Sequence, residues 1–160
     1  MNKTILLTGG AGFIGSHICL TLLDAGFNVF ILDSLENSSI KNIYKLKAYL
    51  NQKRQKNIFE FFKGTIKNLE IIEKIFHRSN SLSLPIDAVI HLAGYKSVSF
   101  SIKDPLNYWE NNVFGTINLL KVMDKFSCRT IVFSSSATVY GNFSKCPITE
   151  NAEINPINCY

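Results

Sequence analysis

The chain has 160 residues, of which 46% are hydrophobic and 18% are charged, and its formal net charge is +5. This length suits one domain, and the hydrophobic content excludes a disordered chain. No hydrophobic run reaches the ~20 residues of a membrane span, and the glycines after Thr8 end the first run too early for a secretory leader.

Strand-like and helix-like segments alternate along the chain. Short apolar or β-rich runs predict strands, and apolar residues at helical spacing predict helices. In chain order we expect a strand at 3–8, a helix at 13–25, a strand at 28–33, a helix at 38–55, a strand at 58–63, a helix at 69–78, a strand at 86–93, a helix at 105–125 and a strand at 129–134. Apolar strands joined by helices predict an α/β fold, a Rossmann-type doubly wound parallel sheet covered on both faces.

The last part of the chain, residues 135–160, is polar and turn-rich and supplies no element that would close such a fold. A structureless segment of this length argues against a complete domain. We therefore expect residues 1–160 to form one domain that is incomplete at its C-terminal end, truncated before a C-terminal substrate domain.

A glycine-rich loop, Thr8-Gly9-Gly10-Ala11-Gly12-Phe13-Ile14-Gly15, joins the first strand to the first helix. Gly9 permits the tight turn, Gly12 lets a pyrophosphate approach the helix N-terminus, and Gly15 lets the helix lie close to the sheet. Asp33 ends the second strand, where its carboxylate can accept both ribose hydroxyls. Because a 2′-phosphate would meet this charge, and residues 34–36 offer no cation, the loop predicts a site for NAD rather than NADP.

Further motifs carry a closer resemblance. They are His91-Leu-Ala-Gly-Tyr-Lys-Ser-Val98, Tyr108-Trp-Glu-Asn-Asn-Val-Phe-Gly-Thr116 and Phe133-Ser-Ser-Ser-Ala-Thr-Val-Tyr-Gly141. With the GxxGxxG spacing, TGGAGFIGSH and LDSLENSS, they resemble the UDP-glucose 4-epimerases of the extended short-chain dehydrogenase/reductase superfamily. The resemblance covers nearly the whole chain.

The resemblance implies a set of cofactor-binding positions and two positions for the reaction. The cofactor positions are Gly9, Gly12, Phe13, Ile14 and Gly15 at the pyrophosphate turn; Asp33, Ser34, Leu35, Glu36, Asn37 and Ser38 around the adenosine ribose; Thr65 and Ile66 beside the adenine; Leu92, Ala93, Gly94, Tyr95 and Lys96 after the fourth strand; and Asn111 on the long helix. Ser136 would hydrogen-bond the UDP-sugar substrate, and Tyr160 matches the catalytic tyrosine of a YxxxK motif.

The implied reaction interconverts UDP-glucose and UDP-galactose by transient hydride transfer between sugar C4 and NAD. A homodimer is expected at full length. The cysteines, with no secretory signal, predict a cytoplasmic protein, and the scattered lysines and short hydrophobic runs argue against a nucleic-acid or membrane partner. Two departures from the family pattern matter. Thr65 stands where the family usually has an aspartate, which replaces a charged hydrogen-bond acceptor with a weaker neutral one. The lysine of the YxxxK motif would lie beyond Tyr160, so we expect the 160 residues alone to be inactive.

Several residues have plainer interpretations beside these. Ser134 and Ser135 suit turn-stabilising roles better than Ser136 does, and Lys96 could be a solvated lysine. His91 lies in an apolar strand and is better interpreted as a hydrogen-bonded core histidine than as a ligand, so no metal is predicted. The lysines from Lys41 to Lys56 suit a solvated helix face. The four cysteines show no metal or redox spacing and are expected to be reduced.

Three functions remain open at this point. The chain could be the NAD-binding part of a UDP-glucose 4-epimerase, or of another extended nucleotide-sugar epimerase or dehydratase, or it could be a non-catalytic NAD-binding module. A dehydratase is expected to carry Asp-Glu near Ala137 and Thr138, which this chain lacks.

Overall fold

A five-stranded parallel sheet forms the centre of the computed structural model, which describes residues 2–54, 56–142 and 146–160. The strands pair in the order β3-β2-β1-β4-β5. Their bounds are β1 Thr4–Thr8, β2 Asn28–Asp33, β3 Phe59–Lys63, β4 Ile86–His91 and β5 Thr130–Phe133. The predicted α/β class, a Rossmann-type doubly wound sheet, is confirmed.

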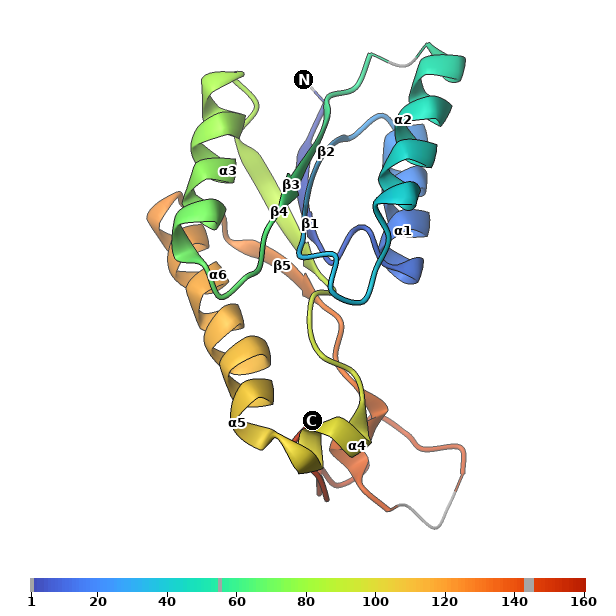
Figure 1. Cartoon of the computed structure of the whole chain (residues 1–160), viewed down its shortest axis with the longest axis vertical. Helices are drawn as coiled ribbons and strands as arrows, with labels where there is room; N and C mark the ends of the chain where they lie inside the picture. The colour runs from blue at the N-terminus through green and yellow to red at the C-terminus, as the bar shows by residue number, and fades with distance from the viewer. Residues whose placement is uncertain (1, 55, 143–145) are drawn as a thin grey trace.

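Helices cover both faces of this sheet (Figure 1). α1 and α2 lie on one side, and α3 and α6 lie on the other. Their bounds are α1 Phe13–Asp24, α2 Ile40–Lys53, α3 Leu69–Ser81 and α6 Gly115–Lys125. Side chains cap the N-termini of two of these helices. The Ser39 hydroxyl accepts from Lys41 N before α2, and the side-chain Oδ1 of Asn68 accepts from Ile71 N before α3. Such caps satisfy backbone donors that a helix leaves free at its start.

Two apolar layers hold the helices to the sheet. Side chains alternate along β1 and β2, so that Leu6 and Phe30 face α3 and α6 while Leu7 and Ile31 face α1 and α2. The first layer also contains Ile72, Ile75, Phe76, Leu119 and Val122, and the second contains Cys19, Leu23, Ile43, Leu46 and Leu50. With both faces of β1 and β2 buried, the strands are continuously apolar, as a doubly covered parallel sheet requires.

The structure differs from the predicted elements mainly after β4. The strand predicted at 86–93 ends at His91, and a short helix that the sequence did not suggest, α4 (Val98–Lys103), follows. The helix predicted at 105–125 is continuous but has three parts: α5 (Pro105–Tyr108), a π-helical segment η1 (Trp109–Phe114) and α6. After β5 a 3₁₀ turn, η2 (Ala137–Tyr140), precedes irregular chain. The end predicted at Gln55 for the second helix lies outside the described residues; α2 ends at Lys53.

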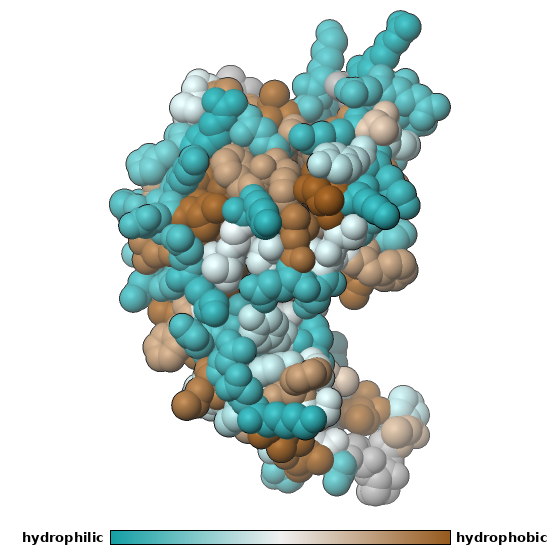
Figure 2. All heavy atoms as spheres, in the orientation of Figure 1, coloured by the Kyte–Doolittle hydropathy of each residue, from teal (hydrophilic) through white to brown (hydrophobic). Residues whose placement is uncertain are grey.

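The basic residues of α2 lie on its solvent side. Lys41, Lys45, Lys47 and Lys53 are exposed, whereas the apolar residues listed above for this helix are buried. Figure 2 shows hydrophilic side chains projecting over the C-terminal end of this helix. Among the described residues, no helix has the length and apolar character that crossing a membrane would need.

His91, at the end of β4, ties the sheet to α6. Its side chain is 1% exposed, and its Nδ1 and Nε2 lie 2.6 Å from Thr8 Oγ1 and 2.9 Å from Thr116 Oγ1. The Thr116 hydroxyl donates to the Asn112 carbonyl, so it accepts from Nε2–H, and Nδ1 then accepts from Thr8. Burial, reinforced by the charge of Lys96, lowers the His91 pKa to about 4. His91 is thus the hydrogen-bonded core histidine that the sequence predicted.

Acid is expected to destabilise the fold through His91. Because the ring is neutral when folded (pKa about 4) but protonates near its ordinary pKa of 6.5 when unfolded, the unfolded chain binds the extra proton. The free energy of unfolding should therefore fall by about 3 kcal/mol as the pH drops from about 6.5 to about 4. Urea unfolding as a function of pH measures this, and His91→Gln should remove that part of the slope. His77→Gln, at an exposed histidine, is the matched control and should leave the slope unchanged.

Candidate functional site: a cleft at the carboxyl edge of the sheet

A cleft of about 440 Å³ lies where the strand order reverses. The chain passes from β1 to β2 and β3 on one side of β1, and then returns to β4 and β5 on the other side. The loops at the carboxyl ends of β1 and β4 therefore diverge. Open α/β sheets bind ligands at such switch points. In Figure 2 the surface is hollowed between the body that carries the sheet and the segment that carries α4.

The glycine loop between β1 and α1 forms the floor of the cleft. Gly9 has φ +71°, and a Cβ there would lie 2.8 Å from Ala93 N; at Gly15 a Cβ would lie 2.2 Å from the Gly9 carbonyl oxygen. These two positions therefore require glycine for packing alone. Gly12 differs, because a Cβ there would meet only the Gly9 oxygen, at 3.3 Å. The N-terminus of α1 thus opens into the cleft without a side chain over Gly12, which suits an anionic group.

The Asp33 carboxylate fastens the glycine loop to the turn after β2. Its Oδ2 accepts from Ala11 N at 2.9 Å, and its Oδ1 accepts from Leu35 N at 2.9 Å and from Ser38 Oγ at 2.7 Å. Asp33 is 6% exposed and lines the cleft. A carboxylate has about four acceptor positions, so Oδ2 retains capacity for one more donor, such as a ribose hydroxyl, while Oδ1 is engaged by the protein.

The turn after β2, which Asp33 holds, forms one wall of the cleft. The loop after β4 forms the opposite wall, and Asn112 holds this loop in place. The Asn112 Oδ1 accepts from Tyr95 N at 2.8 Å, and its Nδ2 donates to the Tyr95 carbonyl at 3.0 Å. Its neighbour Asn111 is 7% exposed, lines the cleft and donates to Asn112 Oδ1 at 2.9 Å. Both asparagines lie in η1, and such π-helical segments often occur at functional sites. Of this polar pair inside a helix, Asn111 therefore lines the cleft and Asn112 holds the loop beside it.

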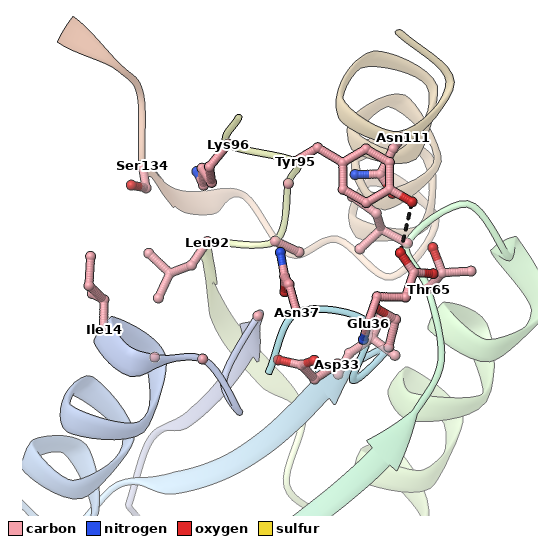
Figure 3. A pocket seen from close by; sticks show the side chains of 18 of the residues that line it. Ile14, Asp33, Glu36, Asn37, Thr65, Leu92, Tyr95, Lys96, Asn111 and Ser134 are labelled. Carbon is pink, nitrogen blue, oxygen red and sulfur yellow. Dashed lines mark hydrogen bonds between the residues drawn. The ribbon is translucent and has the colours of Figure 1, made fainter. Parts of the chain in front are cut away.

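A hydrogen bond links the two walls directly. The Tyr95 hydroxyl donates to Glu36 Oε2 at 2.8 Å, and the pair is seen from close by in Figure 3. Burial, followed by this bond to Glu36, raises the pKa of Tyr95 to about 12. The hydroxyl therefore remains a donor at neutral pH.

Most of the predicted site residues come together at this cleft. Those that line it are Gly9, Gly12, Phe13, Ile14, Gly15, Asp33, Ser34, Glu36, Asn37, Thr65, Ile66, Leu92, Ala93, Gly94, Tyr95, Lys96, Asn111 and Tyr160. Figure 3 shows how side chains from the ends of separate strands and from η1 converge here. Tyr160 reaches the cleft from the distant end of the chain, and its ring meets that of Tyr108 edge-on at 6.5 Å between centroids.

Three predicted residues are not part of the lining. Leu35 and Ser38 act through Asp33, to which they donate as described above. Ser136 stands before η2, where its hydroxyl lies 2.8 Å from Thr138 Oγ1 and accepts from Thr138 N. In this arrangement Ser136 stabilises its own turn, whereas Ser134 and Ser135 line the cleft. The structure thus shows Ser136 in the turn-stabilising position that the sequence suggested for Ser134 and Ser135, while a contact of Ser136 with the substrate stays a prediction.

Sequence reasoning missed the other lining residues. Leu32, Gly64, Ser134 and Ser135 complete the wall. Leu32 and Gly64 could have been found, because Leu32 is the next-to-last residue of one predicted strand and Gly64 directly follows another. Thr65 lies beside them, and its hydroxyl accepts from Lys67 N at 3.3 Å. Within the described part of the chain, no three His, Cys, Asp or Glu side chains gather as a metal site would need.

Comparisons with known proteins agree with this geometry. The family model described as GDP-mannose 4,6 dehydratase matches residues 6–160. The chain is 43% identical over 159 residues to the bifunctional UDP-glucose 4-epimerase and UDP-xylose 4-epimerase 1 of Pisum sativum, covering 99% of this chain and 44% of that protein. It is 45% identical over 149 residues to the UDP-glucose 4-epimerase of Neisseria meningitidis, covering 93% and 41%. The chain thus spans less than half the length of these curated relatives.

Solved structures of similar proteins have the same fold. A UDP-glucose-4-epimerase from Stenotrophomonas maltophila, with bound NAD and formylated UDP-arabinopyranose, has a TM-score of 0.85 and 36% identity, over 99% of this chain and 44% of that one. The enzyme from Bifidobacterium longum, in complex with NAD+ and UDP, has a TM-score of 0.83 and 37% identity, over 96% and 43%.

The fold and the cleft therefore define a Rossmann-type domain with a cleft at its switch point. The match over residues 6–160 makes the assignment specific: the chain belongs to the GDP-mannose 4,6 dehydratase family, and the relatives described above are nucleotide-sugar 4-epimerases.

Proposed function

We propose that residues 1–160 form the NAD-binding domain of a UDP-glucose 4-epimerase. The observation that carries this proposal is the cleft itself. It combines an open helix N-terminus at Gly12, a strand-end carboxylate at Asp33 and a tyrosine at Tyr160 around one volume. The first suits a pyrophosphate and the second a ribose hydroxyl. The named relatives are 4-epimerases, and two similar structures hold NAD or NAD+.

The proposed reaction inverts C4 of a UDP-linked hexose. NAD, when bound, supplies a reversible hydride acceptor for the sugar carbon. Gly12 and the start of α1 would hold its pyrophosphate, and Asp33 Oδ2 would accept from the adenosine ribose. The Tyr160 hydroxyl would remove and return the proton of the sugar 4-hydroxyl, as general acid–base catalysis requires. Ser136 would need to turn from Thr138 to reach the substrate.

Dehydratases of the same family are the competing proposal. The chain has Ala137 and Thr138 where a dehydratase is expected to carry Asp-Glu, and these residues form η2. Without that acid pair the epimerase is favoured. We also propose a cytoplasmic location, which suits the four cysteines: Cys19 and Cys128 are buried, Cys146 and Cys159 are exposed, and all four are free.

We further propose that the full-length protein is a homodimer. Apolar side chains recur at helical spacing along the outer side of the segment from α5 to α6, and they remain exposed: Leu106, Trp109, Val113, Ile117 and Leu120. An unpartnered apolar stripe of this kind suits packing against the same helix of a second copy.

Cofactor choice tests the proposal first. Isothermal titration of the 160-residue chain should show NAD binding more tightly than NADP, because a 2′-phosphate would approach the Asp33 carboxylate. Asp33→Asn should weaken NAD binding by about 1.5–3 kcal/mol, since it neutralises a charged acceptor. Because Asp33 also fastens Ala11 and Ser38, thermal melting of the variant must accompany the titration. Tighter binding of NADP would contradict the assignment.

A fusion tests the reaction. Residues 1–160, joined to the part of the Pisum sativum relative that follows its matching segment, should convert UDP-galactose to UDP-glucose. Tyr160→Phe in this fusion should reduce the rate by about 10²–10⁴-fold, because general acid–base catalysis is lost, while NAD binding is retained. Tyr140→Phe, at another tyrosine near the C-terminal end, is the control. Undiminished activity in the Tyr160 variant would exclude Tyr160 as the acid–base group.

The oligomeric state of the same fusion tests the apolar stripe. Sedimentation should show a dimer, and Trp109→Glu should shift it to monomer because a charge would be buried at the contact. Tyr44→Glu, at an aromatic residue that is 62% exposed on α2, should leave the dimer intact. A dimer that survives Trp109→Glu would place the interface elsewhere.

A further inference from the structure

The Tyr95–Glu36 hydrogen bond joins two loops that the sheet keeps apart. Tyr95 follows β4 and Glu36 follows β2, and these strands are separated by β1. Between them, after β1, lies the glycine loop that forms the floor of the cleft. The bond, 2.8 Å long, therefore runs from one wall of the cleft to the other (Figure 3).

Each end of this bond is fastened to the fold. Tyr95 is held through both its N–H and its carbonyl by Asn112, and its ring packs against Tyr108 with 5.3 Å between centroids. Glu36 follows Leu35, a non-glycine residue with φ +65°, whose N–H donates to Asp33. Such a backbone conformation persists only where the surroundings hold it. The bond therefore joins two loops that are each fixed independently of it.

We propose that the Tyr95–Glu36 pair is a clasp that closes over a dinucleotide in the cleft and slows its release. The proposal rests on the proposed function, because it names the pair that retains the same cofactor. Both residues line the cleft and neither is the acid–base group or the ribose acceptor. A ligand that extended along the glycine loop would lie beneath the bond, so this hydrogen bond must open, by movement of the two side chains, before the ligand can leave.

The chemistry of the pair suits a clasp that works throughout the neutral pH range. A phenol that donates to a carboxylate forms a charge-assisted bond, which is stronger than one between neutral groups. The raised pKa of Tyr95, about 12, keeps its proton in place on the donor. Glu36 is on the exposed side of the pair, so the bond can open to water without breaking the packing beneath it.

Rates of cofactor release test the clasp directly. The 160-residue chain is loaded with NADH and mixed with excess NAD, and the loss of NADH fluorescence gives the dissociation rate. Tyr95→Phe keeps the ring and its packing on Tyr108 but removes the donor, and should raise this rate about tenfold, equivalent to ~1.4 kcal/mol. Glu36→Gln, which leaves a neutral acceptor, should give a smaller increase. Glu36→Ala should match Tyr95→Phe.

A double variant separates a clasp from two unrelated contacts. If the two side chains act through one bond, Tyr95→Phe with Glu36→Ala should release NADH no faster than either single variant. Tyr49→Phe is the matched control: its hydroxyl also donates to a carboxylate, Asp24, at 2.7 Å, but on α2 outside the cleft lining. That variant should release NADH at the unmodified rate.

The outcomes distinguish this proposal from the one on which it rests. If the unmodified chain binds no NADH, the proposed function fails. If it binds NADH and Tyr95→Phe leaves the dissociation rate unchanged, or if the effects of the single variants add in the double variant, the clasp is overturned and the proposed function stands. Melting curves of each variant, unchanged within the series, establish that faster release does not come from a loosened fold.

Discussion

The reversal of strand order on either side of β1 is the constraint on which the site depends. β1 pairs with β2 on one side and with β4 on the other, and all three strands run in the same direction. Right-handed crossovers then place α1 and α2 on one face and α3 and α6 on the other. The loops after β1 and β4 touch where they begin, at Gly9 and Ala93, and then turn toward opposite faces, so that the cleft is the space between them. Its position follows from topology before any polar residue is considered.

Polar side chains then hold the edges of this space in place. Asp33 fastens the glycine loop to the turn after β2, and Asn112 fastens the loop after β4 to η1. The buried His91, between Thr8 and Thr116, connects the sheet edge to the helix that begins after η1. Apart from the Ser38 bond within the turn itself, these bonds join residues 17 to 83 positions apart in the sequence. The walls are therefore preorganised by the protein, and a ligand need not order them on binding, which lowers the entropic cost of association.

Residues of the same type have different structural roles around the cleft. Three glycines of one loop differ in what a side chain would meet: Gly9 and Gly15 are required by packing, while Gly12 leaves the helix end open. Among the serines after β5, Ser134 and Ser135 face the cleft, and Ser136 stabilises η2. Asn111 lines the cleft, and its neighbour holds a loop. Residue type alone does not separate these tasks, because each depends on which neighbour lies within about 3 Å.

The sequence by itself determined the fold class, the order of the strands and main helices, and the glycine loop. These follow from local patterns: continuously apolar strands, helices with an apolar stripe, and glycines spaced around a strand-to-helix turn with Asp33 at the next strand end. Only the tertiary structure decided that Asp33 fastens the glycine loop while it lines the cleft, that η1 interrupts the long helix, and that Tyr95 meets Glu36, 59 positions away in the sequence. Such contacts depend on loop conformation and on the packing of distant segments, and a pattern read along the chain carries no information about the distance between two loops.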